Sequence, residues 1–301
     1  METEGRVAIS VIIPVRDDPR VRDVVAALVE ELPSDAEILV ADDGPAGRLP
    51  PLPGARIVPV HSGSPGNARN QAARQARGNL LLFLDADVVV PAGWIGVARS
   101  IFADRRVLAA QGYSESVGRG ELPRRMQEEY DRFVSSHDPT GQEDLCDTRC
   151  FGIRREVFER FLFDVEEPYC EDSALGRRLF EARIPIRFVR EWRVGHHHSR
   201  SAIDELSRLR RYAAASAAHL RRTGRDLFRV PGGPAPRGPG AALLRLCGRR
   251  SALAHPVAAI LWLAALGLGA GAAAPPPLGR RLFSAARRVA VLSARIAAPS
   301  R

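Results

Sequence analysis

The sequence predicts an α/β protein built on a doubly wound, mostly parallel β-sheet. The run Leu-Leu-Leu-Phe-Leu at residues 80–84 is short, wholly apolar and bounded by turn residues, which is typical of a strand buried on both faces. Residues 7–13 and 37–41 are similar β-branched runs, and a helical period separates them. The run at 80–84 leads directly into Asp85 and Asp87, at the strand end where such sheets bind ligands.

The other segments continue the alternation of strands and helices. Pro14 is expected to close the first strand, and Pro33 to end the helix at residues 21–32. Further strands are expected at residues 56–60, 107–111, 150–153 and 186–189. Further helices are expected between the turn at 62–66 and Gly78, at 94–103, at 122–134, from Glu171 onward, and at 201–223.

The charge of the chain is unevenly distributed. All 44 basic residues are arginines, which together with the high alanine content indicates a bacterial source with GC-rich DNA. Residues 1–200 carry 27 arginines against 32 acids, a net charge of −5, whereas residues 201–301 carry 17 arginines against 3 acids, a net charge of +14. A basic segment of this kind fits an anionic membrane surface or a nucleic acid. Aromatic residues are not interleaved with these arginines, so we expect no nucleic-acid partner.

A linker rich in Pro and Gly at residues 231–240 divides the chain into a predicted catalytic domain, residues 1–230, and a basic, apolar helical tail, residues 241–301. Within the tail, residues 257–274 are free of proline but number only 18, which is marginal for crossing a membrane. A single crossing by this stretch from a cytosolic catalytic domain would also place the arginines that follow it outside, against the positive-inside bias. No signal peptide is recognised. We therefore expect a cytoplasmic protein whose tail associates with the cytoplasmic face of the membrane, a soluble helical tail being the alternative.

The four cysteines form neither a Cys-x-x-Cys pair nor a dense framework, so we expect them to be reduced, as in a cytosolic protein. Cys146 and Cys150 could join the three histidines at 196–198 in a zinc site, but their spacing is not that of a zinc ribbon. Zinc is therefore the weaker interpretation.

Asp85 and Asp87 are candidate metal ligands. Two carboxylates separated by one alanine repel each other unless a cation joins them, and a divalent cation takes carboxylate and phosphate oxygens together. The alternative is a strand that ends in a polar turn. One of the three histidines at 196–198 is a candidate to complete the metal site, since imidazole and carboxylate share manganese-type sites, although the three could equally form a solvated loop.

Two further segments carry candidate binding groups. The turn at residues 62–66 opens a helix whose backbone amides, with Arg69 nearby, are suited to a diphosphate, although such a turn is commonly only structural. Glu171 and Asp172 fall in the first turn of another helix, where acids stabilise the helix dipole whatever else they do.

Taken together, these segments resemble a family 2 glycosyltransferase of the GT-A fold. The matching segments follow the family's order over about residues 7–222: Ser-Val-Ile-Ile-Pro-Val-Arg-Asp at 10–17, Val-Ala-Asp-Asp-Gly at 40–44, Ala-Arg-Asn at 68–70, Leu-Asp-Ala-Asp at 84–87, Cys-Glu-Asp at 170–172 with Leu175 and Arg178, and Val-Gly-His at 194–196. The resemblance implies a nucleotide-sugar donor and a divalent metal, Mn or Mg. It leaves the acceptor open as a glycan, a lipid-linked compound or a small molecule.

The resemblance also implies roles for individual residues. The nucleotide-sugar site would comprise Pro14, Arg16, Asp43, Arg69, Asp85 and Glu171, with Asp43 at the base. The metal ligands would be Asp85, Asp87 and His196, and Asp172 would be the catalytic base. The sequence departs from the family pattern at Arg16 and Asp17, which replace an aromatic–Asn pair, and at Pro45, where serine is common.

These residue types suit sugar transfer. A divalent ion neutralises the charge that develops on the departing nucleoside diphosphate. Asp172 is placed to take the proton of the acceptor hydroxyl as it attacks the opposite face of the sugar, which inverts the anomeric centre. Two alternatives are a nucleotidyltransferase acting on a sugar phosphate and a non-catalytic, membrane-tethered protein that binds nucleotide sugars. The first normally has a basic, glycine-rich loop after its first strand, whereas residues 14–18 here are acidic.

Overall fold

The computed structural model describes residues 8–45, 49–135, 144–167, 169–198 and 201–224, with individual positions between 261 and 292. The chain forms two compact units. The first contains residues 1–118 and 131–197, and the second contains residues 119–130 and 198–301. All the candidate site residues belong to the first unit.

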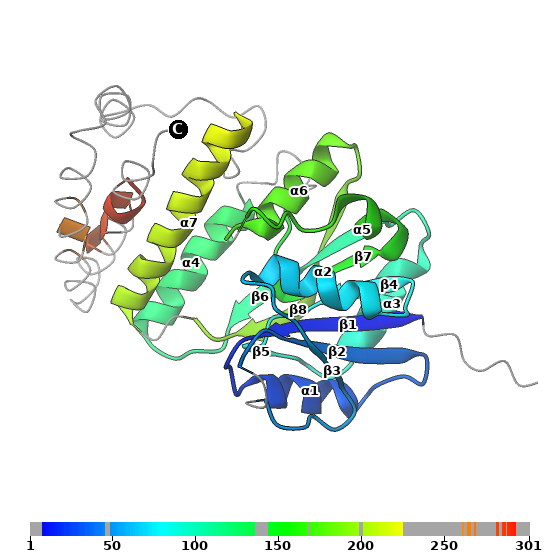
Figure 1. Ribbon diagram of the computed structural model, residues 1–301. Helices are drawn as coiled ribbons and strands as arrows, with labels where there is room; N and C mark the ends of the chain where they lie inside the picture. The colour runs from blue at the N-terminus through cyan, green and yellow to red at the C-terminus, as the bar shows by residue number, and fades with distance from the viewer. Residues whose placement is uncertain are drawn as a thin grey trace, which may run out of the picture. The chain divides into compact units, whose positions relative to one another are not determined.

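A mixed sheet with the strand order β3-β2-β1-β4-β7-β6-β8-β5 forms the centre of the first unit (Figure 1). Its strands are β1 (Ile9–Val15), β2 (Ala36–Asp42), β3 (Arg56–Pro59), β4 (Leu80–Phe83), β5 (Val88–Val89), β6 (Ala109–Ser116), β7 (Phe151–Arg154) and β8 (Ile186–His196). The strands β3, β2, β1 and β4 run parallel, as do β6 and β8. β7 is antiparallel to both of its neighbours, and β5 is antiparallel to β8. The α/β, mostly parallel sheet is thus confirmed.

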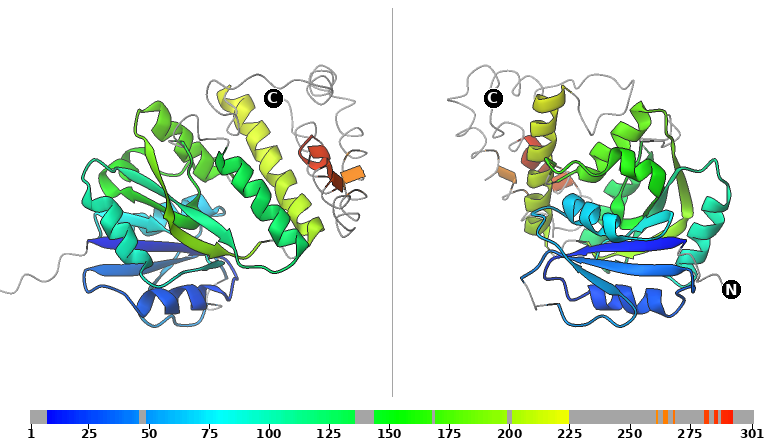
Figure 2. Two further views of the ribbon diagram at one scale, coloured as in Figure 1. Left: turned by 180° about the vertical axis from the view of Figure 1, so that it is seen from behind. Right: turned by 45° about the vertical axis from the view of Figure 1, so that its right-hand side comes forward.

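Helices cover both faces of this sheet, and Figure 2 shows α1 and α2 on opposite sides of β1 and β2. The helices are α1 (Val21–Val29), α2 (Pro65–Gln75), α3 (Trp94–Ala103), α5 (Arg155–Phe161) and α6 (Glu171–Glu181), and a 3₁₀ turn, η2, spans Thr148–Cys150. Alternate residues of β1 serve the two faces: Val11 packs in one core cluster with Val24 of α1, and Ile12 in the other with Ala72 of α2. Strands buried on both faces explain the continuous apolar runs.

The parallel strands bring the predicted site to one edge of the sheet. Val15 at the end of β1 is level with Asp42 of β2, and Phe83 at the end of β4 is level with Ile12. The segments that leave these strands carry Asp18, Asp43 and Asp85, so acids far apart in the sequence emerge at the same edge.

The expected end of the first strand was wrong, because β1 runs through Pro14, which is level with Ala41. The backbone amide of Leu84 donates to the carbonyl of Ile12, so Ile12 faces β4. Pro14, two residues on, faces the same side but lies past the last residue of β4. The missing proline N–H therefore breaks no ladder hydrogen bond.

β6 and β8 are also longer than expected, and β8 includes residues that were expected to follow the strand. Trp192 and Val194 are buried while Arg193 between them is exposed, which is the period of a strand with one buried face. At its end His196 pairs with Val88 of β5. The expected strand at 186–189 was therefore too short, and His196 sits on a sheet strand rather than in a loop.

The second unit contains α7 (Ala202–Thr223), which confirms the helix expected at residues 201–223. The helix expected at 122–134 is also confirmed as α4 (Glu121–Ser135). In the described part of the chain, no helix combines the length and apolar character needed to cross a membrane. The linker at 231–240 and most of the tail lie outside the described residues, so the predicted division at residue 230 stays a prediction.

Candidate active site

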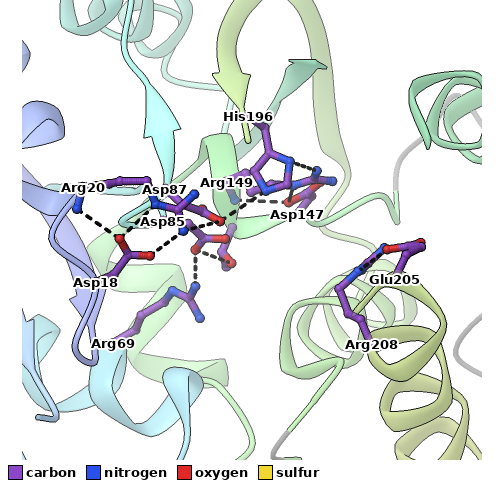
Figure 3. Close-up of polar contacts among 11 residues, drawn as sticks. Asp18, Arg20, Arg69, Asp85, Asp87, Asp147, Arg149, His196, Glu205 and Arg208 are labelled. Carbon is purple, nitrogen blue, oxygen red and sulfur yellow. Dashed lines mark hydrogen bonds and ion pairs between the residues drawn. The ribbon is translucent and has the colours of Figure 1, made fainter. Parts of the chain in front are cut away.

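Arg69 joins two of the predicted acidic segments. From α2 its Nη2 donates to Oδ1 of Asp85, 2.5 Å away (Figure 3). Its Nη1 donates to Oε1 of Glu171 at 2.8 Å. The arginine is only 3% exposed and Glu171 is also buried, so the contact between these two is shielded from water, whereas Asp85 is partly exposed. A single guanidinium thus links the end of β4 to the start of α6.

Close packing of α2 against the start of α6 makes this bridge possible. A Cβ at Gly66 would lie 2.8 Å from Cγ of Glu171, so only glycine allows this approach. Asn70 fixes the same region, because its amide nitrogen donates to the carbonyl of Phe163 at 2.8 Å and its amide oxygen accepts from the Phe163 backbone N–H at 2.9 Å. The Phe163 ring lies 5.6 Å from Cζ of Arg69.

Asp87 faces two basic side chains from other elements. Its Oδ2 lies 3.5 Å from Nε2 of His196 at the end of β8 and 3.8 Å from Nη2 of Arg20. Arg20 is held in turn by Asp18, with Nη2 2.6 Å and Nε 2.9 Å from its carboxylate oxygens. The backbone amide of His197 also donates to the carbonyl of Asp87 at 3.4 Å. Of the three histidines, His196 is therefore the one whose side chain reaches the predicted metal ligand.

The segment around η2 brings a further acid and arginine to the site. Arg149 forms a short hydrogen bond from Nη2 to Asp147, and its Nε donates to Oδ1 of the same carboxylate at 2.8 Å. The Gln111 side chain of β6 fixes this segment, since its amide nitrogen donates to the carbonyls of Asp147 and Cys150 and its amide oxygen accepts from the Asp147 N–H at 2.7 Å. Figure 3 shows Asp147, Arg149 and His196 together beside Asp87.

The carboxyl of Asp172 is held in an unusual protonation state. Burial, together with the negative charges of Glu171 and Asp147, raises its pKa to about 8. Its Oδ1 accepts a 2.7 Å hydrogen bond from the Ser173 backbone N–H, which favours the ionised form but does not outweigh the other causes. A carboxyl with a pKa near neutrality is suited to exchanging protons with a substrate.

At the other end of the site, the pKa values of Asp87 and Asp85 are shifted in opposite directions. Burial acts to raise the pKa of Asp87, but the hydrogen bond from His196 and the nearby charges outweigh it and hold the pKa below its usual range. Burial raises the pKa of Asp85 despite the opposing charge of Arg69. Of these two acids, Asp87 is therefore the one whose carboxylate form the environment favours.

The site fits a divalent metal in its donor types and in its charge. Among the residues that the structure describes, no group of three or more His, Cys, Asp and Glu side chains is already arranged to hold a metal ion. Asp87 and His196 nevertheless offer a carboxylate and an imidazole to a common point, the combination that suits manganese. The described residues discussed above include six acids and three arginines, an excess of three negative charges when all the acids are ionised: Asp18, Asp85, Asp87, Asp147, Glu171 and Asp172, with Arg20, Arg69 and Arg149.

Other predicted residues are placed at the same sheet edge. Asp43 accepts a 2.7 Å hydrogen bond from the backbone N–H of Ser62, which ties the end of β2 to the turn before α2. Pro14 is half-buried and Arg16 is exposed at the end of β1. The roles expected for these residues in nucleotide binding stay predictions. Cys146 and Cys150 are buried, and burial raises the pKa of both thiols.

Sequence reasoning missed four charged residues of this site. Asp18 and Arg20 belong to the acidic turn after β1 and follow the matching segment at residues 10–17. Asp147 and Arg149 lie in a polar stretch that offered no motif. A local signal existed in both cases, an Asp two residues before an Arg, but this spacing is common on protein surfaces and indicates a site only once the fold places it beside Asp87.

Comparison with known proteins agrees with this fold. Residues 10–162 match the family described as glycosyl transferase family 2. An uncharacterized glycosyltransferase of Bacillus subtilis, EpsJ, is 25% identical over 240 residues, which cover 71% of this chain and 67% of that protein.

Three solved structures share the fold. The mannosyltransferase PcManGT from Pyrobaculum calidifontis, in complex with GDP-Man and Mn²⁺, has a TM-score of 0.58 at 17% identity, covering 93% of this chain and 86% of its own. A crystal structure of S. aureus TarS has a TM-score of 0.53 at 17% identity, covering 96% and 90%. Glucosyl-3-phosphoglycerate synthase from Mycobacterium tuberculosis, in complex with Mn²⁺, UDP and glucosyl-3-phosphoglycerate, has a TM-score of 0.52 at 18% identity, covering 72% and 80%.

The fold and the acidic site thus define an α/β enzyme of the GT-A type. The chain belongs to glycosyl transferase family 2, and it is a nucleotide-sugar-dependent glycosyltransferase.

Proposed function

We propose that this enzyme transfers a sugar from a nucleotide-sugar donor to an acceptor hydroxyl with inversion of the anomeric centre, in the presence of Mn²⁺ or Mg²⁺. The observation that carries the proposal is the buried Arg69 bridge from Asp85 to Glu171. It couples the acids expected at the donor diphosphate to the segment that contains the expected base, Asp172. Family membership also argues against the nucleotidyltransferase and the non-catalytic alternatives.

The donor side of the site would be formed by the residues at the end of β4. Asp87 and His196 would hold the metal, with Asp85 beside them, and the ion would neutralise the charge that develops on the leaving nucleoside diphosphate. Two of the solved structures that share the fold contain Mn²⁺, one with GDP-Man and one with UDP, which supports this assignment. Asp43 would contact the base, and Pro14 and Arg16 would border the same pocket.

The acceptor side would depend on Asp172. As a carboxylate it would take the proton of the acceptor hydroxyl while the hydroxyl oxygen bonds to the anomeric carbon and the bond to the diphosphate breaks on the opposite face. The neighbouring negative charges of Glu171 and Asp147 contribute to raising its pKa and so make it a stronger proton acceptor. Its raised pKa is the electrostatic feature that favours this role over a purely structural one.

Arg69 would act differently from what the sequence predicts. The sequence places it near a diphosphate, but its guanidinium is buried and already donates to two carboxylates. We therefore assign it the positioning of Asp85 and Glu171 rather than direct contact with the donor.

The experiment for this proposal is a thermal-shift panel of UDP-, GDP- and dTDP-sugars with and without Mn²⁺. A true donor should raise Tm only when the metal is present, because the proposed ion holds its diphosphate. The rise should grow with the logarithm of ligand concentration over Kd, since a ligand that binds the native state stabilises it. Transfer should then be measured with the best donor, and the anomeric configuration of the product read by NMR. Retention of configuration would contradict the direct displacement.

We also propose that the enzyme works at the cytoplasmic face of the membrane through its basic C-terminal region. Support comes from the charge of +14 carried by residues 201–301, because anionic lipid headgroups attract clusters of arginine. A lipid-linked acceptor would fit this location.

A further inference from the structure

His196 lies between the carboxylate of Asp87 and the guanidinium of Arg149. Its Nε2 is 3.5 Å from Oδ2 of Asp87, and its Nδ1 is 3.3 Å from Nη1 of Arg149 (Figure 3). Pairing of His196 with Val88 fixes the backbone at this point, and Gln111 fixes the segment that carries Arg149. Both ring nitrogens therefore have a defined neighbour.

These neighbours determine where the imidazole carries its proton. A guanidinium only donates hydrogen bonds, so the nitrogen that faces Arg149 must be an acceptor. A neutral imidazole has one donor and one acceptor nitrogen, which puts the proton on Nε2, where it points to the Asp87 carboxylate. The opposite tautomer would place an N–H against Arg149 and a lone pair against Asp87, and the imidazolium would also place an N–H against Arg149.

This tautomer conflicts with metal binding at Nε2, because a coordinating imidazole nitrogen must offer its lone pair. We propose that Arg149 is a positioning residue that holds His196 with its proton on Nε2, so that Nε2 could serve as a metal ligand only if Arg149 released Nδ1. The inference rests on the proposed function, in which Asp87 and His196 hold the metal.

Asp147 provides the partner that the rearranged histidine needs. Once the proton moves to Nδ1, that nitrogen becomes a donor and requires an acceptor. The carboxylate of Asp147 accompanies Arg149 through two hydrogen bonds and lies in the same fixed segment. Metal-bound histidines usually donate their other N–H to a carboxylate or a carbonyl, so Asp147 would be the candidate for this role with a metal at Nε2.

The proposal is tested with a double-mutant cycle on metal affinity at a single pH. Mn²⁺ binding is measured by EPR of the free ion for the wild-type enzyme, Arg149→Met, His196→Ala and the double variant. Arg149→Met should tighten Mn²⁺ binding about three- to tenfold, the range that the net free energy of one hydrogen bond gives. In the His196→Ala background the same substitution should have a clearly smaller effect, because the histidine through which it acts is gone.

Arg20→Met is the matched control, since it removes another arginine beside Asp87 that contacts the carboxylate directly. Its effect on Mn²⁺ affinity should be the same with and without His196. Two-bond ¹⁵N–¹H spectra of the metal-free enzyme should show the His196 proton on Nε2, and Arg149→Met should increase the Nδ1-protonated form.

Three outcomes contradict the inference. An equal effect of Arg149→Met with and without His196 would show that Arg149 acts on the metal only by charge repulsion and not through the histidine. A proton on Nδ1 in the wild-type spectra would show that Arg149 does not hold the proton on Nε2. Either result leaves the proposed metal site intact. The absence of Mn²⁺ binding in all four proteins would instead overturn the metal site of the proposed function, and this inference with it.

Discussion

Arg69 and Glu171 are separated by 102 residues in the sequence and joined by a 2.8 Å hydrogen bond in the fold. Both side chains are buried, and the same guanidinium holds Asp85. An ion pair buried in this way costs desolvation for each partner, so removal of one partner leaves the other charge without compensation. Substitution of either residue should therefore destabilise the enzyme.

Substitution of Arg69 by methionine should destabilise the enzyme by about 3–5 kcal/mol, because it leaves Glu171 as an uncompensated buried acid beside Asp85. Urea unfolding measures this change. Arg74→Met on the same helix is the control, since Arg74 is exposed and its loss should change stability by no more than about 0.5 kcal/mol. Equal stabilities for the two variants would show that the Arg69 bridge contributes nothing.

The elements of this site differ in how far the sequence predicts them. The strand at Leu80–Phe83 and the acids after it follow from a local pattern, an apolar run that ends in carboxylates, and the structure confirms both. The bridge from Arg69 to Glu171 has no local signal, because it depends on how α2 packs against α6 at Gly66. Motif order implied that these segments share a site, but it could not show that the arginine points to carboxylates.

Elsewhere a turn-like composition concealed regular structure. His196 follows a glycine and precedes two more histidines, which suggests a loop, yet pairing with β5 and β6 extends the strand to this residue. Tertiary pairing therefore overrode local propensity at the point that brings the histidine to Asp87. Asp18, Arg20 and Arg149 were missed for a related reason, since their importance comes only from proximity to Asp87.

Asp87→Ala should abolish most transfer and remove the Mn²⁺ dependence of nucleotide binding, because it deletes the carboxylate that the surrounding charges keep ionised. Isothermal titration of nucleotide with and without Mn²⁺ measures the loss. His196→Ala should weaken metal binding less. His197→Ala is the control, because this side chain is exposed and only its backbone N–H contacts Asp87. Metal dependence that survives in Asp87→Ala would place the ion elsewhere.

The pH dependence of catalysis should reflect Asp172. Burial and two neighbouring acids raise its pKa to about 8, and a base acts only when deprotonated. The value of kcat/KM, which reports the free enzyme, should therefore rise tenfold per pH unit below pH 8 and level off above it. A profile that stays flat between pH 6 and 9 would show that no group with this pKa controls the reaction.

The stability of the native enzyme should fall as pH rises, whereas kcat/KM should rise. Between the ordinary pKa of an aspartate and pH 8, the native enzyme keeps a proton on Asp172 that the unfolded chain has released, so the free energy of unfolding falls as pH rises. Asp172→Asn lacks this pH-dependent loss of stability. Its Tm minus that of the wild type should therefore increase from pH 5 to pH 8. A constant difference in Tm across this range would contradict the raised pKa.

The basic C-terminal region should bind anionic vesicles. The full chain should co-sediment with phosphatidylglycerol vesicles at low salt and be released at high salt, because screening weakens the attraction between arginines and headgroups. Phosphatidylcholine vesicles are the lipid control, and a chain that ends at Gly224 is the protein control. Equal sedimentation of the two proteins would show that residues after 224 do not provide the membrane contact.

The most direct test of Asp172 as the catalytic base is turnover of Asp172→Asn beside its donor affinity. The asparagine keeps the shape of the side chain but cannot accept the proton of the acceptor hydroxyl, so turnover should fall by a factor of about 10²–10⁴. Donor affinity should stay near that of the wild type, because the change is on the acceptor side. Asp23→Asn is the matched control, an exposed acid in the first turn of α1 whose loss affects only the helix dipole. A turnover of Asp172→Asn close to that of Asp23→Asn would contradict the assignment.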